Sequence, residues 1–228
     1  MKSAIITFPG SNCDRDAYDA LKKINSKVQN IWYNESSLDN DLDLIIIPGG
    51  FSFGDYLRSG AMASISPIIK EVKRLSNKGV RILGICNGFQ ILTETKLLPG
   101  VLLRNEKMKF ICRQLYLRVE DVNSDFTKKY KKRQIIKLPI AHMDGNFYAD
   151  NDTMKNLEDD ALIAFRYVNE YGNVTDDSNP NGSLLNIAGI FNKERNILGM
   201  MPHPERAIDI NTGSADGLAL FESLNTLF

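Results

Sequence analysis

Cys86 lies in the segment Gly84-Ile85-Cys86-Asn87-Gly88, between an apolar run and a segment with helical spacing. A glycine stands two residues before it and another two residues after it. This spacing is typical of a nucleophile elbow, in which a sharp strand-to-helix turn exposes the nucleophile and the glycines avoid side-chain clashes. The helix N-terminus stabilises a thiolate there, and the Asn87 amide is placed to donate to an oxyanion. A buried structural cysteine is the alternative, but it does not need paired glycines.

His203 is the predicted base, and the chain has only two histidines. It lies between two prolines, and Pro204 disfavours the helical conformation at His203. We expect an extended segment, in which Glu205 projects to the same side as His203 and holds its tautomer. The alternative interpretation is a surface turn after the preceding strand. Together with Cys86, the pattern indicates a nucleophile, a base and an orienting carboxylate, a set suited to amide hydrolysis.

A glycine-rich segment, Pro48–Asp55 (PGGFSFGD), follows an apolar run that ends at Ile47. Ligands of open α/β sheets bind beyond the carboxyl ends of the strands. Gly50 lets a backbone amide approach a ligand closely, so we predict a second oxyanion donor there. The spacing matches neither a dinucleotide-binding fingerprint nor a Walker loop. A plain glycine-rich turn explains the segment equally well.

Cys13 is a rival nucleophile, because it also lies between an expected strand and an expected helix. It lacks the paired glycines, and the neighbouring Asp14 and Asp16 disfavour a thiolate. Cys112 falls within an expected strand, so we expect it to have a structural role. Cys86 is therefore preferred over both.

Short apolar runs alternate with longer periodic ones in the first half of the chain, which predicts a parallel sheet covered by helices on both faces. The expected strands are Ser3–Phe8, Val28–Trp32, Leu42–Ile47 and Val80–Ile85. The expected helices are Asp14–Ile24, capped by Ser11 or Asn12, then Ala61–Ser76 and Asn87–Thr93.

The second half of the chain is richer in β-structure. Its expected strands are Phe110–Val122, Gln134–Ala141, Ala161–Val168, Leu184–Phe191 and Asn196–Met200, with a hairpin turn at Asn192–Asn196 and a final helix at Ser214–Leu227. The turn-rich segment Gly172–Gly182 is interpreted as an internal loop, since apolar strands flank it. We therefore expect residues 1–228 to form a single α/β domain.

The formal charges balance, with 28 Lys and Arg against 28 Asp and Glu. Nucleic acids and anionic membranes favour basic surfaces, so we expect neither as a partner. The basic cluster Lys128–Arg133 is interpreted as a solvated turn. No apolar run is long enough to span a bilayer, and the N-terminus does not have the pattern of a signal peptide. Three widely spaced cysteines favour the reducing cytoplasm and argue against a disulfide framework or a metal site.

Several motifs together resemble a known family. They are FPGSNCDRD, PGGFSFGDYLRSGAMA, GICNGFQIL, LPIAH, NPNGS and GMMPHPER, which extend from Phe8 to Arg206. The elbow, the glycine loop and the PHPE segment resemble the triad class (class I) of glutamine amidotransferases. The whole set is similar to the glutaminase subunits of phosphoribosylformylglycinamidine synthases, which act in purine biosynthesis.

The resemblance implies a flavodoxin-like α/β fold that hydrolyses L-glutamine to glutamate and ammonia through a thioester on Cys86. By position, the Gly50 and Asn87 amides form the oxyanion hole, and Gln90 lies near the glutamine site. The family passes ammonia to a large synthetase subunit, which uses ATP, Mg²⁺ and formylglycinamide ribonucleotide, and a small third subunit joins the complex. No cofactor or metal is implied for this chain.

One motif departs from the family pattern. After His142 the chain reads Met143-Asp144, where the family more often has Gly-Glu. This leaves open the roles of His142 and Asp144, in a region that is a candidate contact for the partner. Two other functions also stay open: a thiol hydrolase of the PfpI type (a protease or deglycase), and a non-catalytic assembly subunit. The first would share the elbow but not the PHPE pairing, and the second has no reason to keep all three catalytic residues.

Overall fold

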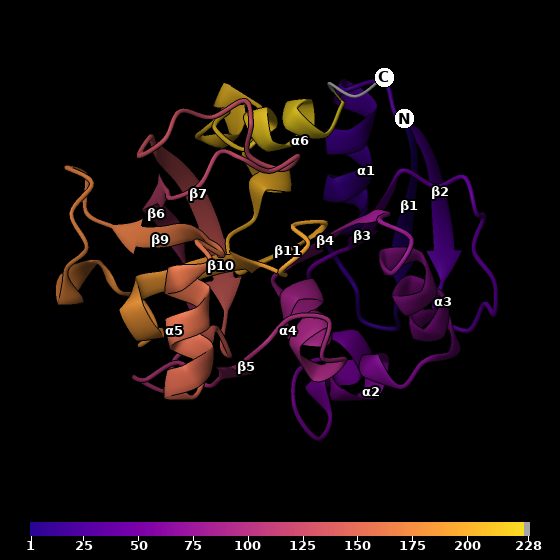
Figure 1. Ribbon diagram of the computed structural model, residues 1–228, viewed down its shortest axis with the longest axis horizontal. Coiled ribbons are helices and arrows are strands. Elements are labelled where there is room, and N and C mark those ends of the chain that lie inside the picture. The colour runs from indigo at the N-terminus through magenta and orange to yellow at the C-terminus, as the bar shows by residue number, and fades with distance from the viewer. Residues whose placement is uncertain (226–228) are drawn as a thin grey trace.

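A nine-stranded mixed sheet runs through both halves of the chain in the computed structural model, which describes residues 1–225 (Figure 1). In order across the sheet, its strands are β2 (Lys27–Trp32), β1 (Lys2–Thr7), β3 (Leu44–Ile47), β4 (Arg81–Ile85), β11 (Ile197–Met200), β10 (Ile187–Phe191), β9 (Ile163–Val168), β6 (Ile111–Val119) and β7 (Ile135–His142).

The first five strands in this order are parallel, as the β–α alternation predicts. The order β2-β1-β3-β4-β11 is that of a flavodoxin-like sheet. Helices α1 (Asp14–Lys23) and α6 (Leu218–Asn225) cover one face, and α3 (Pro67–Ser76), α4 (Asn87–Glu94) and α5 (Asn151–Asp159) lie on the other (Figure 1). Strands β3 and β4 are buried along their whole length, which explains why they read as unbroken apolar runs.

The β-rich second half extends this same sheet with antiparallel strands. Strands β10 and β11 form the expected hairpin around residues 192–196. Two short strands, β5 (Val101–Leu103) and β8 (Asn146–Tyr148), pair separately. The basic cluster lies in the connection between β6 and β7, and four of its five basic residues are exposed, as a solvated turn requires.

The helix expected at Ala61–Ser76 is wrong, because it is two helices, α2 (Ala61–Ser64) and α3. Ser66 is extended, with φ −65° and ψ 148°, because Pro67 excludes the helical conformation from the residue before it. The predicted cap of α1 is also wrong. Cys13 occupies the N-cap position, and the Ser11 hydroxyl instead accepts a hydrogen bond from the Phe8 amide.

Two elements begin three or four residues later than expected. Residues Leu184–Asn186 form a 3₁₀ turn with Leu185 at φ 51°, so β10 begins only at Ile187. Helix α6 begins at Leu218, since Ser214 forms a bridge with Asp209, and its expected end at Leu227 lies outside the described residues.

Helix α5 was not predicted, although the sequence carries a signal for it. Asp150 caps the helix by accepting a hydrogen bond from the Thr153 amide at 2.8 Å, and the buried Met154 and Leu157 stand three residues apart. Within residues 1–225, no helix is long and apolar enough to cross a lipid bilayer.

Candidate active site

A cavity of about 230 Å³ lies where the carboxyl ends of the parallel strands meet. The segments after β1, β3, β4 and β11 all reach it, because parallel strands end at the same edge of a sheet. Its lining residues are Asn12, Cys13, Gly50, Phe51, Cys86, Phe110, Cys112, Ala141, His203 and Arg206. The fold thus brings Cys86, His203 and Gly50 together from distant parts of the sequence.

Cys86 occupies a strained turn between β4 and α4, with φ 51° and ψ −105°. Its thiol points toward the Ala141 carbonyl oxygen, to which it donates at 3.7 Å. The flanking glycines are sterically required. A Cβ at Gly84 would lie 2.8 Å from the backbone of Gly88, and a Cβ at Gly88 would overlap the Ile47 carbonyl oxygen. The turn therefore has the geometry of a nucleophile elbow.

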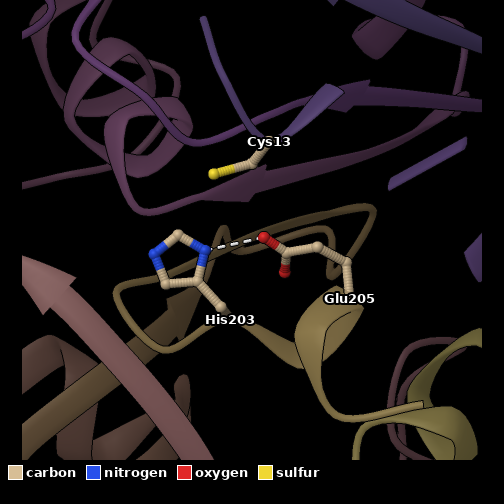
Figure 2. A group of neighbouring side chains, drawn as sticks. All are labelled: Cys13, His203 and Glu205. Atoms are coloured by element: carbon tan, nitrogen blue, oxygen red, sulfur yellow. Dashed lines mark hydrogen bonds and ion pairs between the residues drawn. The ribbon is translucent and has the colours of Figure 1, made fainter. Parts of the chain in front are cut away.

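His203 and Glu205 form a buried pair, each 2% exposed. The His203 Nδ1 and Glu205 Oε1 atoms are 2.6 Å apart (Figure 2). The expected extended segment is wrong beyond His203, because Pro204 begins a 3₁₀ turn that folds Glu205 back onto the imidazole. His203 itself is not helical, and its amide is anchored on the Pro139 carbonyl oxygen of β7 at 2.9 Å.

The surroundings of His203 favour its protonated form. Burial lowers the pKa of His203, but the Glu205 carboxylate and the Cys86 and Cys13 thiols raise it, so that the pKa lies well above its ordinary value. Nδ1 is engaged by Glu205, whereas Nε2 is buried and has no hydrogen-bond partner among the described residues. Nε2 is therefore the atom available for proton transfer in the cavity.

Gly50 follows β3 and adopts φ 142°, which favours glycine. Its backbone lies tightly against the segment after β1: a Cβ at Gly50 would lie 2.7 Å from the Asn12 nitrogen and from the Gly10 oxygen. The next amide, of Phe51, donates to the Gly10 carbonyl oxygen at 2.9 Å. These contacts hold Gly50 at the cavity, opposite the first turn of α4.

Asn87 and Gln90 lie beside the cavity but do not line it. The Asn87 Oδ1 atom accepts from the Ser52 amide at 3.2 Å, and its Nδ2 donates to Gln90 Oε1 at 2.8 Å. Gln90 Nε2 then donates to the Asp144 carbonyl oxygen at 2.6 Å. Their side chains therefore join the glycine loop, the elbow helix and the turn after β7. A direct contact between Gln90 and a substrate stays a prediction.

His142, at the end of β7, is buried and lies outside the cavity lining. Its Nδ1 lies 3.1 Å from Asn105 Oδ1, and a Cβ at Gly145 would lie 2.7 Å from its Nε2. Burial, together with the nearby His203, lowers the pKa of His142 to about 4. His142 is therefore neutral, and it packs inside the turn that carries Asp144.

The turn after β7 connects several loops around the site. The Asp144 carboxylate accepts from Ser59 Oγ at 2.8 Å and from Arg104 Nε at 2.9 Å. Asn181, from the NPNGS motif, donates to the Gly145 carbonyl oxygen at 2.8 Å. The motifs LPIAH and NPNGS are distant in sequence, yet they share this network.

Cys13 lies next to His203, the predicted base, and the sequence did not indicate this contact (Figure 2). It is 2% exposed, and its Sγ donates to Asn12 Oδ1 at 3.1 Å and accepts from Arg206 Nη2 at 3.2 Å. Burial is the main reason that the pKa of Cys13 is raised, and the nearby His203 opposes the shift. Cys13 is thus a protonated neighbour of the base. Its burial, and not the adjacent aspartates, keeps it so.

Cys112 was expected to have a structural role, and this expectation is wrong. Its side chain is exposed on β6 and contributes to the cavity lining. Packing therefore does not explain the presence of a thiol at this position.

The ligating atoms of Cys13, His203 and Glu205 lie within 4.8 Å of one another, as a metal site would require. The distance of 2.6 Å between His203 and Glu205 is nevertheless that of a hydrogen bond. Two ligands on a tetrahedral zinc ion, each bonded at roughly 2.0 Å, would stand about 3.3 Å apart. The group fits a hydrogen-bonded pair beside a thiol better than a metal centre.

The CobB/CobQ-like glutamine amidotransferase domain matches residues 1–216 of this chain. The phosphoribosylformylglycinamidine synthase subunit PurQ of Methanosarcina mazei is 52% identical over 225 residues, which cover 98% of this chain and 97% of that protein. The chain belongs to the PurQ-like glutamine amidotransferases. The PurQ subunit of Methanosarcina barkeri is equally similar, at 52% identity over 225 residues.

Solved structures agree with membership of the PurQ-like family. A chain in the structure of PurLQS from Thermotoga maritima is 41% identical, with a TM-score of 0.86, over 98% of this chain and 96% of that chain. A glutamine amidotransferase from the same organism, only 15% identical, shares the fold with a TM-score of 0.59 over 93% of this chain and 78% of that chain. The resemblance that the motifs indicated, and the α/β fold it implied, are confirmed.

Proposed function

We propose that this chain is the glutamine-hydrolysing subunit of a phosphoribosylformylglycinamidine synthase, with residues 1–228 acting as a single glutamine amidotransferase domain. The observation that carries the proposal is the pairing of His203 Nδ1 with Glu205 at 2.6 Å, while Nε2 has no hydrogen-bond partner within residues 1–225 and His203 lines the same cavity as Cys86. Membership of the PurQ-like family supports glutamine as the substrate.

In the first step, the Cys86 thiol gives its proton to His203 Nε2, and the resulting thiolate attacks the side-chain amide carbon of glutamine. The carbonyl electron pair moves to the oxygen, and the Gly50 and Asn87 amides donate hydrogen bonds to this oxyanion. When the intermediate collapses, His203 gives its Nε2 proton to the leaving nitrogen, so that ammonia departs and a thioester remains on Cys86.

In the second step, His203 Nε2 takes a proton from water, and the hydroxide attacks the thioester carbon. Glutamate then leaves and the Cys86 thiolate is restored. Throughout both steps Glu205 accepts the hydrogen bond from Nδ1, which keeps Nε2 directed at the reacting atoms and stabilises the imidazolium when it forms.

The ammonia is a reagent for another subunit under this proposal. A large synthetase subunit would consume it with ATP, Mg²⁺ and formylglycinamide ribonucleotide to give formylglycinamidine ribonucleotide, and a small third subunit would complete the complex. The Thermotoga maritima relative is part of a structure named PurLQS, which supports this assembly. This chain would need no cofactor of its own.

The free thiols of Cys13, Cys86 and Cys112 suit the cytoplasm, where we place the protein.

The test compares two nitrogen donors in the assembled complex. Cys86→Ala should abolish glutamine-dependent synthesis and leave synthesis from ammonium salts intact, because only ammonia production needs the thiol. Loss of both activities would overturn the role of Cys86. Retention of glutamine-dependent activity would favour a non-catalytic assembly subunit.

Labelling with the glutamine analogue diazo-oxo-norleucine tests substrate class and site together. Peptide mapping should place the label on Cys86 in the unmodified chain and in a Cys112→Ala control, which lacks another thiol of the same cavity. A label on Cys13 would contradict the assignment. Absence of labelling, with hydrolysis of another amide or ester, would favour the PfpI-type thiol hydrolase.

A further inference from the structure

Two of the three cysteines of the chain converge on one small space beside His203. A Cβ added to Gly49 would lie 3.0 Å from Cys13 Sγ, 3.3 Å from Cys86 Cβ and 2.8 Å from His203 Cε1. The space is left open because residue 49 is a glycine. The Cys13 sulfur and the Cys86 Cβ atom therefore both border the position that a side chain of residue 49 would take, which places them at most about 6.3 Å apart (3.0 Å plus 3.3 Å). Both cysteines line the same cavity.

The surroundings of Cys13 suit a thiol that reacts only after Cys86 has been modified. Burial raises the pKa of Cys13, so at rest it is protonated and does not compete for substrate. The Arg206 guanidinium donates to its sulfur at 3.2 Å. A cation at this distance stabilises negative charge that develops on Sγ during an attack.

Cys86 is buried but lines the cavity, so a small oxidant that enters the cavity can reach it as glutamine does. A thiolate in an accessible cavity reacts with a peroxide to give a sulfenic acid, and further oxidation to the sulfinic acid is irreversible by ordinary thiols. A second thiol within reach can capture the sulfenic acid first, as a disulfide that reductants reopen.

We propose that Cys13 is the resolving thiol for Cys86, and that peroxide converts the pair to a reversible disulfide that shields the nucleophile. The proposal rests on the role of Cys86 as the reactive thiol given above. Cys112 lines the same cavity from β6, but it is exposed and is not among the three atoms nearest to the open space at Gly49. Cys112 is therefore the natural control.

The chemistry balances in two steps. The Cys86 thiolate attacks one oxygen of hydrogen peroxide, which breaks the O–O bond, leaves a sulfenic acid on Cys86 and releases hydroxide that is protonated to water. Cys13 Sγ then attacks the Cys86 sulfur. The S–O bond breaks, and the Cys13 proton, passed through His203, leaves with the hydroxide as a second water. The two thiols lose two electrons and the peroxide gains them.

Disulfide formation requires a separation of about 2.05 Å between sulfurs and of about 3.5–4.5 Å between Cβ atoms. Rotation of both side chains into the space beside Gly49 brings the sulfurs toward each other, and no side chain of residue 49 stands in the way. The disulfide would occupy the position that the substrate carbonyl needs. Oxidised protein should therefore be unable to form the glutamyl thioester.

The experiment treats the full-length chain with hydrogen peroxide, alkylates it without reduction and maps the peptides by mass spectrometry. We expect a Cys13–Cys86 linked peptide, which disappears on treatment with dithiothreitol, together with full return of diazo-oxo-norleucine labelling. Cys112→Ser should give the same linked peptide. In Cys13→Ser, and in Cys13→Ala as a second variant, Cys86 should advance to sulfinic acid, and dithiothreitol should restore no labelling.

A Cys86–Cys112 link, or sulfinic acid on Cys86 of the unmodified chain without any linked peptide, would overturn the proposal. The Cys13–Cys86 linked peptide is sought in the unmodified chain, so this result does not depend on whether a variant folds. The proposed function fails by a different measurement, the glutamine-dependent synthesis of the Cys86→Ala complex. The two failures are therefore distinguishable.

Discussion

Replacing Gly88 with alanine tests whether the elbow depends on the close approach of α4 to β3. The added Cβ would overlap the Ile47 carbonyl oxygen and lie 2.8 Å from the Ile47 carbonyl carbon. Carbon atoms in contact stand about 3.5–4.0 Å apart, so the start of α4 must move by roughly 1 Å. This movement carries Cys86 with it, whereas His203 is fixed on the segment after β11 and on β7.

The two consequences of this movement have different magnitudes. Overpacking of a rigid interior costs about 1–3 kcal/mol of unfolding free energy. A misplacement of about 1 Å between reacting groups costs on the order of 100-fold in turnover. We therefore expect Gly88→Ala to remain folded while losing about two orders of magnitude in glutamine hydrolysis.

Gly79→Ala is the matched control for Gly88→Ala. Gly79 adopts φ 85° at the opposite edge of the sheet, and a Cβ there meets nothing within 4 Å. This variant should lose about 1–2 kcal/mol because its backbone is left-handed, but its turnover should not change. Urea denaturation gives the stabilities, and glutamate release by the assembled complex gives the turnover. Normal turnover in Gly88→Ala, or an equal loss in Gly79→Ala, would refute the reasoning.

Three further changes address the charges and the packing around the site. Glu205→Gln removes the carboxylate that raises the pKa of His203, so the alkaline limb of the pH–rate profile should move to lower pH. The value of kcat/KM should also fall by on the order of 10³-fold. An alkaline limb that does not move would count against the pairing of Glu205 with His203. His142 has a pKa of about 4 in the folded chain, below its ordinary value, so the unfolded chain binds the extra proton and stability falls as pH drops from about 6.5 to 4. His142→Asn should remove about 2–3 kcal/mol of the stability difference between pH 7 and pH 4.5, measured by urea denaturation, and an equal difference in both proteins would contradict this. In Gly145→Ala, the added methyl group should press on the His142 ring and displace the turn that holds Gln90. The KM for glutamine should then rise about tenfold, an effect comparable to the loss of one hydrogen bond, with a smaller change in kcat. A selective loss of kcat would contradict this prediction.

The elbow could be predicted because its determinants are local. The requirement for glycine at residues 84 and 88 arises from contacts of a single tight turn with its own helix and the adjacent strand. The turn imposes that requirement wherever it occurs, so the spacing alone identifies it. The non-helical backbone of His203 could be predicted for the same reason, because Pro204 restricts the residue directly before it. Pro204 did not reveal the 3₁₀ turn that follows, because a proline begins such a turn as readily as it continues an extended segment.

The neighbours of the proposed triad could not be predicted, since they depend on how distant loops meet. Cys13 and His203 are separated by most of the chain, and no pattern in either segment records their contact. The bond from Gln90 to the Asp144 carbonyl oxygen uses a backbone atom, which carries no sequence signal. Helix α5 is a different case, because its capping residue and apolar spacing were present in a segment to which no element was assigned.

The order of the strands explains why the β-rich second half contributes to the proposed site. Cys86 follows β4, which lies between β3 and β11, so Gly50 and His203 approach it from the two neighbouring strands. An oxyanion donor and a base must act on different atoms of the same amide, and placement on either side of the nucleophile allows this. The chain reaches β11 only after it has built the antiparallel strands, and β7 among them supplies the Ala141 wall of the cavity and the anchor for the His203 amide. The antiparallel half is therefore the connection that brings the proposed base next to the proposed nucleophile, and changes that loosen β7 should displace His203 before they affect the elbow.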